Sequence, residues 1–163
     1  MRTISEYYIE SYRILFFDEM SDYEKVIAEL TEKLKGEQNS HGYNNLGVAH
    51  YEIGELDKAL ENFNLAIELN SENGIAYINR AFLNEKWNKI ADAEMDYGKA
   101  IELNPTNATY WRSRAYLLKE KGALAKALSD FKRAKKIEPN FQQTINEITE
   151  LEQSLGIAPK NSG

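Results

Sequence analysis

A five-residue string occurs twice in the chain at a fixed distance. The letters AIELN stand at residues 66–70 and again at 100–104, an offset of 34 residues. The same offset aligns three consecutive units, residues 40–73, 74–107 and 108–141. A fixed period in this range indicates small supersecondary units that bury a continuous core only by stacking on one another. The repeat therefore constrains the fold more than any other feature of the sequence.

Each unit reads as two amphipathic helices joined by a short turn. In the first unit, apolar residues recur at helical spacing over 43–53 and again over 56–69. Gly54 ends the first of these segments, and Asn88 and Gly122 stand at the same place in the two later units. A proline closes the second and third units, where a second helix must stop. The pattern predicts three helix–turn–helix units in a row.

Small residues recur at fixed places in both helices of every unit. Two helices approach closely only where neither side chain intrudes, so these places predict the helix crossings, and the aromatic residues between them are expected to fill the wider gaps. The aligned small residues are Gly47, Ala81 and Ala115, then Ala59, Ala93 and Ala127, then Ala66, Ala100 and Ala134, and the aromatics are Phe63, Tyr97 and Phe131.

At these residues the sequence resembles the tetratricopeptide repeat family. That family has a helix–turn–helix unit of about 34 residues, with a large aromatic early in the first helix, Gly or Ala four residues later, an Ala–Phe–Ala series in the second helix and a closing Pro. Tyr43, Tyr77 and Trp111 supply the early aromatic. One departure is that Arg80 and Arg114 stand where the first unit has a leucine. The resemblance implies an all-α fold, a right-handed α-solenoid of such repeats.

The ends of the chain are expected to cap this stack, because a row of repeats exposes an apolar face at each end. Residues 142–156 carry an apolar stripe at helical spacing and predict a C-terminal capping helix, with a disordered tail over 157–163. Residues 1–39 read as a helical pair, either a degenerate repeat or a cap. Its first helix is rich in aromatic residues, interpreted as core packing or, alternatively, as a dimer or partner surface: Tyr7, Tyr8, Tyr12, Phe16 and Phe17.

Composition argues against most kinds of enzyme. The chain has no cysteine, which excludes disulfides, cysteine-ligated metals and cysteine nucleophiles. It has two histidines, His41 and His50, and no glycine-rich phosphate loop, nucleophile elbow or metal-binding helix motif. The carboxylates Asp92 and Asp96 are interpreted as a solvated helix face. The sequence therefore predicts no catalytic residue, no metal and no cofactor.

Charge is spread unevenly along the chain. The formal net charge is −6, yet residues 108–141 carry 9 basic and 3 acidic side chains, and residues 40–73 carry 1 basic and 6 acidic ones. This distribution argues against general nucleic-acid binding, which needs a coherent basic surface, and allows an acidic partner near the third unit. No signal peptide or membrane-spanning run is recognisable. A cytoplasmic protein without membrane association is the expectation, as a monomer or weak homodimer.

The resemblance also implies where a partner would bind. First helices of the family line a concave groove that holds peptides or partner helices. Asparagines there can bond to a peptide backbone, aromatics offer apolar area, and cations supply positive charge toward one end. The groove positions map to Asn44, Asn45 and Tyr51 in the first unit, Ile78, Asn79, Phe82 and Lys86 in the second, and Arg112, Tyr116 and Lys119 in the third.

A subgroup of the family binds the C-terminal carboxylate of heat-shock chaperones through a set of Lys, Asn and Arg residues. Asn79 matches one of them, but the other matching positions carry no charge, including Asn44 and Val48. That specificity is therefore disfavoured. The functional prediction is a protein–protein interaction module for an extended peptide or partner helix. The alternative is a self-associating structural scaffold that uses the aromatic N-terminal helices.

Overall fold

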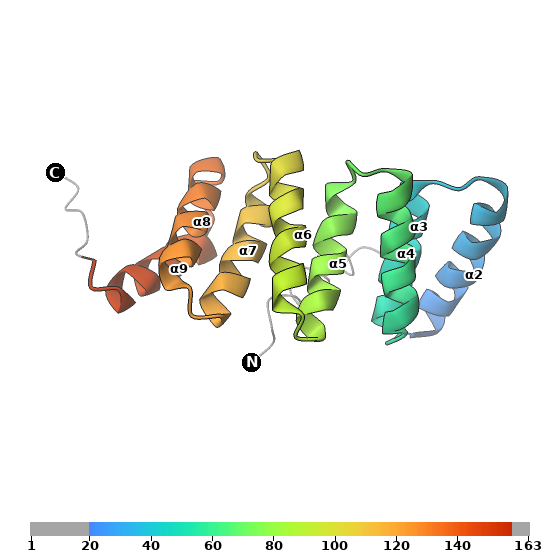
Figure 1. Cartoon of the computed structure of the whole chain (residues 1–163), viewed down its shortest axis with the longest axis horizontal. Helices are drawn as coiled ribbons and strands as arrows, with labels where there is room; N and C mark the ends of the chain where they lie inside the picture. Colours follow the sequence, from blue (N-terminus) through green and yellow to red (C-terminus); the bar gives the residue numbers. More distant parts are fainter. Residues whose placement is uncertain (1–19, 158–163) are drawn as a thin grey trace. The chain divides into compact units, whose positions relative to one another are not determined.

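Figure 1 shows the computed structural model of the chain, which describes residues 20–157. Every regular element within that range is an α-helix, so the predicted all-α class is confirmed. The chain divides into two compact units, Met1–Leu103 and Asn104–Gly163. The first contains α2 (Met20–Gly36), α3 (Ser40–Glu52), α4 (Leu56–Leu69), α5 (Gly74–Lys86) and α6 (Ile90–Leu103), and the second contains α7 (Ala108–Glu120), α8 (Leu124–Ile137) and α9 (Gln142–Ser154).

Three antiparallel helix pairs carry the repeat: α3 with α4, α5 with α6, and α7 with α8. The turn inside each pair has one residue in the left-handed region, with φ of 82° at Gly54, 57° at Asn88 and 77° at Gly122. Glycine and asparagine tolerate this conformation better than other residues do. The three positions are spaced by one repeat, as the sequence predicted, and they reverse the chain so that the two helices of a pair lie against each other.

Asparagines begin the first helix of each pair. The side chains of Asn39, Asn73 and Asn107 each accept a hydrogen bond from a backbone N–H of the first turn, at 2.7, 3.2 and 3.0 Å. Such N-caps satisfy donors that the helix itself leaves open. Asn73 also donates to the buried hydroxyl of Ser40 at 2.8 Å, and Ser40 donates to the carbonyl of Ala66 at 2.7 Å. This relay links the starts of α3 and α5 to the end of α4.

The core lies at the helix crossings, where the small residues were predicted. All six repeated alanines of the second helices are fully buried, and so are Ala81 and Ala115 of the first helices. Phe63, Tyr97 and Phe131 are almost completely buried beside them. At Gly47 the approach is closest, because a Cβ atom there would lie 2.6 Å from Cε1 of Phe63. The interpretation of these positions as close contacts is confirmed.

The ends of the described chain are single helices. Helix α2 packs against α3, and its Leu34 is buried. Helix α9 packs against α8, and its Leu151 is buried. The predicted first helix with its five aromatic residues lies outside the described residues, and so does the predicted tail from residue 158 onward. The domain limits drawn from the sequence stay a prediction.

Candidate peptide-binding surface

Three residues of the predicted binding surface form a row of amide hydrogen bonds across α3 and α5. Asn79 donates from Nδ2 to Oδ1 of Asn44 at 2.8 Å, and Asn44 donates to Oδ1 of Asn45 at 3.4 Å. Asn44 is buried, Asn79 is half-buried and Asn45 is exposed. An amide carries both donors and acceptors. The accessible members can therefore bond to a peptide main chain, while the buried Asn44 fixes their orientation.

A lysine and a tyrosine meet on the same two helices. The ammonium group of Lys86, from α5, lies 4.9 Å from the ring centroid of Tyr51, from α3. That distance is within the range of a cation–π interaction. Lys86 is exposed and Tyr51 is half-buried. The arrangement holds a positive charge beside an aromatic side chain at the C-terminal ends of α3 and α5, about two helical turns beyond the amide row.

The two apolar groove positions predicted in the second repeat, Ile78 and Phe82, are covered in the folded chain. Ile78 and Phe82 of α5 keep only 6% and 5% of their surface exposed. The ring of Phe82 packs edge-on against Tyr97 of α6, with 5.7 Å between ring centroids. They therefore have little area left for a ligand.

In the third repeat, the predicted cation Arg112 is buried and already bonded. It donates to Oε2 of Glu138 at 2.5 Å and to the hydroxyl of Thr109 at 3.0 Å, and it stacks over the ring of Phe141 at 4.3 Å. Tyr116 is also buried and packs edge-on against Phe131 at 4.8 Å between centroids. Both side chains hold α7 to neighbouring segments of its own unit.

Lys119 of α7 pairs with the last described helix. Its ammonium group lies 2.5 Å from Oε2 of Glu147 and 3.4 Å from Oε2 of Glu150, both in α9. Burial alone lowers the pKa of Lys119, but the hydrogen bonds and charges of Glu147 and Glu150 outweigh it and raise the pKa above its ordinary value. Lys119 is thus charged, and its charge is largely neutralised by α9. This pairing leaves Lys119 with less charge available to a ligand than the sequence predicted.

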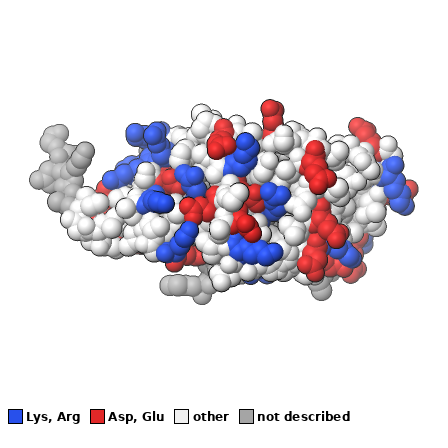
Figure 2. Space-filling model, in the orientation of Figure 1, with Lys and Arg blue, Asp and Glu red and all other residues white. Residues whose placement is uncertain are grey.

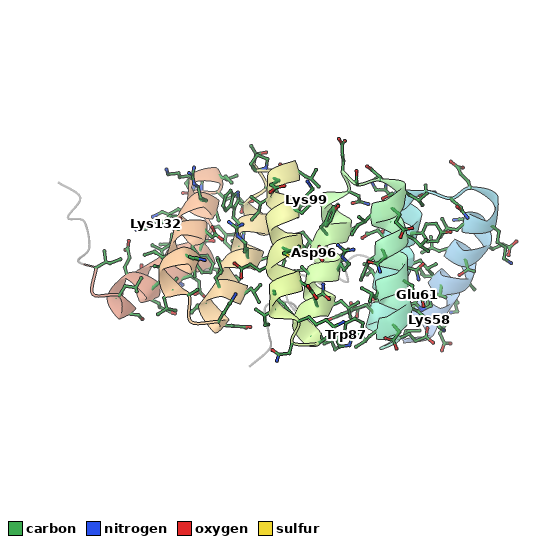
Figure 3. All side chains as sticks on the ribbon, viewed as in Figure 1. Lys58, Glu61, Trp87, Asp96, Lys99 and Lys132 are labelled. Carbon is green, nitrogen blue, oxygen red and sulfur yellow. The ribbon has the colours of Figure 1, made fainter. Side chains whose placement is uncertain are left out.

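Two arginine–aspartate pairs were missed by the sequence reasoning. Arg80 donates to both carboxylate oxygens of Asp96 at 2.9 and 2.7 Å, and Arg114 does the same with Asp130 at 2.7 and 3.0 Å. Figure 3 labels Asp96, which lies on α6 beside α5. The interpretation of Asp96 as a solvated carboxylate is therefore wrong, because it is buried and paired. The 34-residue offset shared by both pairs was the available signal.

His50 belongs to a structural contact at the turn between α3 and α4. Its Nδ1 lies 2.6 Å from Oε2 of Glu55, and Lys58 donates to the other oxygen of Glu55 at 2.9 Å. Hydrogen bonds from Lys58 and His50 hold the pKa of Glu55 below its ordinary value. Across residues 20–157 there is no group of three His, Asp or Glu side chains arranged to hold a metal ion.

The antiparallel pairs and their constant spacing define a helical-repeat protein. Family models described as tetratricopeptide repeat match residues 41–73, 75–107 and 97–129. The chain therefore belongs to the tetratricopeptide repeat family, whose domains mediate protein–protein interactions and are typically not catalytic.

Solved structures show the same fold. A crystal structure of MamA is 20% identical, covers 88% of both chains and has a TM-score of 0.75. The first tetratricopeptide repeat domain of Spaghetti (RPAP3), bound to the HSP90 peptide SRMEEVD, is 24% identical over 73% of this chain and 94% of that one, with a TM-score of 0.67. The OM64 domain of Arabidopsis is 26% identical over 70% and 94%, with a TM-score of 0.63.

No curated protein sequence matches the chain. Among the helices of residues 20–157, none combines the length and the apolar character that crossing a bilayer requires.

Proposed function

We propose that the chain is a non-enzymatic binding module that holds an extended peptide or a partner helix against the first helices of its repeats. The observation that carries the proposal is the row of amides Asn79, Asn44 and Asn45 across α3 and α5. Side-chain amides fixed at such spacing can pair with the donors and acceptors of a peptide main chain, which gives affinity without a sequence requirement.

Selectivity in this proposal comes from Tyr51 and Lys86, about two helical turns beyond the amide row on the same two helices. A fixed aromatic side chain contributes contact area at a low entropy cost, and the exposed ammonium of Lys86 favours a peptide with an acidic side chain at that point. Three residues that the sequence placed in the same surface act as structural supports within the third repeat: Arg112, Tyr116 and Lys119.

The proposed ligand differs from the chaperone peptide bound by the RPAP3 domain. Recognition of a terminal carboxylate needs several converging cations. On α3, the positions that would supply them carry Asn44 and Val48, and on α7, Lys119 is paired with α9. We therefore propose an internal stretch of an extended peptide, or one face of a helix, as the bound element.

A peptide-display experiment tests the proposal on the full chain. Linear peptides are selected from a random library on the wild-type protein, and the tightest one is synthesised with a fluorophore. Its affinity is measured by fluorescence anisotropy for wild type and for the double variant Asn45→Lys with Lys86→Glu. We expect the double variant to bind about tenfold more weakly or worse, because both substitutions change the chemistry of the surface without touching the core.

The matched control is Lys33→Glu. It changes an exposed lysine on α2, a helix that contributes no residue to the amide row. It is expected to bind the peptide as wild type does. Equal affinity for all three proteins would place the binding surface elsewhere. Failure to select any peptide, with a folded protein, would count against peptide binding itself.

A further inference from the structure

Overlapping faces of two second helices carry opposite charge. On α4, the exposed carboxylates Asp57, Glu61 and Glu68 lie on one side of the helix. On α8, two repeats further along the sequence, an overlapping side carries exposed cations: Lys136 takes the place of Glu68, while Ala125 and Ser129 take the places of Asp57 and Glu61. The cations of that basic face of α8 are Lys126, Arg133 and Lys136. Figure 2 shows red side chains gathered over α4 and blue ones over α8.

These charges lack the local partners that several other exposed charges have. Four other exposed lysines, at positions 25, 35, 58 and 99, form ion pairs one turn away, as Lys35 does with Glu32 at 2.7 Å. Within residues 20–157, none of the three cations on the α8 face and none of the three carboxylates on the α4 face takes part in an ion pair. Lys132, at the edge of the α8 face, pairs with Glu152 at 2.7 Å.

The two compact units are charged oppositely as wholes. Met1–Leu103 contains 20 acidic and 10 basic side chains, and Asn104–Gly163 contains 6 acidic and 10 basic ones. Charge of one sign on each unit repels like units of different molecules and attracts unlike ones. Complementary potentials of this kind steer encounter and fix the orientation of the contact.

The acidic face of α4 also exposes apolar surface. Leu65 is 38% exposed and Leu69 is 46% exposed, and Leu65 occupies the place that Arg133 takes in α8. Long basic side chains can lay their aliphatic stems over such leucines while their charged ends reach carboxylates. The α4 face thus offers both the charges and the apolar area that a basic helix face would cover.

We propose that the basic face of α8 in one copy of the chain docks on the acidic face of α4 in a second copy. The occupant of each face is therefore the oppositely charged face of another copy. The contact joins second helices of different copies. It uses outer second helices, so it leaves the proposed peptide surface on α3 and α5 accessible and does not depend on it.

A charge-swap experiment tests this contact with full-length chains. One variant makes α8 acidic with Lys126→Glu, Arg133→Glu and Lys136→Glu, and the other makes α4 basic with Asp57→Lys, Glu61→Lys and Glu68→Lys. Association is measured by sedimentation velocity at about 0.02 M and about 0.5 M salt, where screening lengths differ several-fold. Wild type is expected to associate at low salt and to dissociate at high salt.

Each variant alone is expected to associate about a hundredfold more weakly than wild type, because its two faces then carry the same sign. An equimolar mixture of the two variants is expected to associate again, since each supplies the face that the other lacks. A milder pair, Arg133→Gln with Lys136→Gln, serves if a triple variant fails to fold, and is expected to weaken association with an unchanged melting curve.

Three results would overturn the proposal. Wild type could remain monomeric at low salt, which would leave the α8 face to an acidic protein of another kind. The acidic-α8 variant could associate as wild type does, which would place self-association on other residues. Both folded variants could remain monomeric when mixed, which would show that the two faces do not meet.

Discussion

The α3/α4 pair and the α5/α6 pair fill one packing position in different ways. Where α3 carries Leu46, α5 carries Arg80, and where α4 carries Asn62, α6 carries Asp96. Leu46 and Asn62 are both buried, and Asn62 satisfies its amide within α4 by donating to the carbonyl of Lys58 at 2.7 Å. The first pair is therefore locally neutral at this position, while the second is charged.

In the α5/α6 pair, the charged groups of Arg80 and Asp96 are bonded to each other and to neighbouring side chains. Besides its two bonds to Asp96, Arg80 donates to Oδ1 of Asn64 at 2.8 Å and lies over the ring of Tyr77 at 5.5 Å. The hydrogen bonds with Asp96 raise the pKa of Arg80 above its already high ordinary value. The α7/α8 pair repeats this solution with Arg114 and Asp130. The apolar position of the first helix can therefore be an arginine when an aspartate stands at the facing position of the second helix.

The largest expected effect comes from breaking that pair on one side. Arg80→Leu restores the residue found in α3, yet it leaves the carboxylate of Asp96 buried without its cation. We expect it to lower the free energy of unfolding by about 3–5 kcal/mol, the usual cost of an uncompensated buried charge. Urea denaturation followed by circular dichroism measures the change.

The matched control is the double variant Arg80→Leu with Asp96→Asn, which copies the α3/α4 combination into α5/α6. It is expected to recover most of the loss, although the contacts of Arg80 with Asn64 and Tyr77 stay absent. If the double variant were as unstable as the single one, the two pairs would not be interchangeable, and the comparison would fail.

A second difference lies at the closest helix approach. The first pair has Gly47 where the others have Ala81 and Ala115. We expect Gly47→Ala to destabilise the chain by about 2 kcal/mol, because the added methyl group overlaps the buried ring of Phe63 and overpacking costs about 1–3 kcal/mol. Differential scanning calorimetry gives the shift in melting temperature.

Gly36→Ala is the control for this substitution, because nothing lies within 4 Å of a Cβ built there. It is expected to leave the melting temperature nearly unchanged. If Gly47→Ala left the melting temperature unchanged, α3 and α4 would have to separate enough to admit the added methyl group, as α5 and α6 admit that of Ala81.

The crossings and turns could be predicted from the sequence because they depend on residues within one repeat. A period of 34 residues, small residues at fixed places and a left-handed residue in each turn are all local in the chain. The N-cap asparagines share that period, so the same signal would have revealed them. Their role needs only the position of a helix start, which the apolar pattern already supplied.

The candidate surface could be predicted only in part, because burial depends on residues far along the chain. Arg112 and Lys119 look like free cations until Glu138 and α9 are placed beside them. Asp96 looks solvated until Arg80 reaches it from the preceding helix. Asn45 and Lys86, by contrast, were assigned to accessible positions and are exposed, although Lys86 lies over the ring of Tyr51.

A smaller effect separates the turns of the two pairs. The α3/α4 turn uses Gly54, whereas the α5/α6 turn holds Asn88 at φ of 57°. Asn88→Ala is expected to lower the stability by about 1 kcal/mol, because a left-handed conformation costs a residue with a Cβ about 1–2 kcal/mol and asparagine offsets part of this. Asn88→Gly, the matched variant, is expected to be as stable as wild type or slightly more so in the same urea titration. A more stable Asn88→Ala would contradict the turn assignment.

The smallest expected effect is a difference in pH dependence at the same turns. The first pair bonds Glu55 to His50 and Lys58, whereas the second has Lys89 at the place of Glu55 and Asn84 at the place of His50. Since the pKa of Glu55 in the folded chain lies below its ordinary value of 4.5, the unfolded chain binds a proton more readily at this residue. Its contribution to stability is therefore present above about pH 4.5 and is lost as the pH falls through the lowered folded value.

Glu55→Gln is accordingly expected to reduce the fall in melting temperature between about pH 5 and about pH 3 relative to wild type. Glu61→Gln, which changes an exposed carboxylate of α4 that has no ion pair within residues 20–157, is the control and is expected to keep the wild-type slope. If Glu55→Gln and Glu61→Gln changed the slope equally, the His50–Glu55–Lys58 contact would not distinguish the first turn from the second. The polar chemistry that separates the two pairs would then reduce to the buried Arg80–Asp96 bond alone.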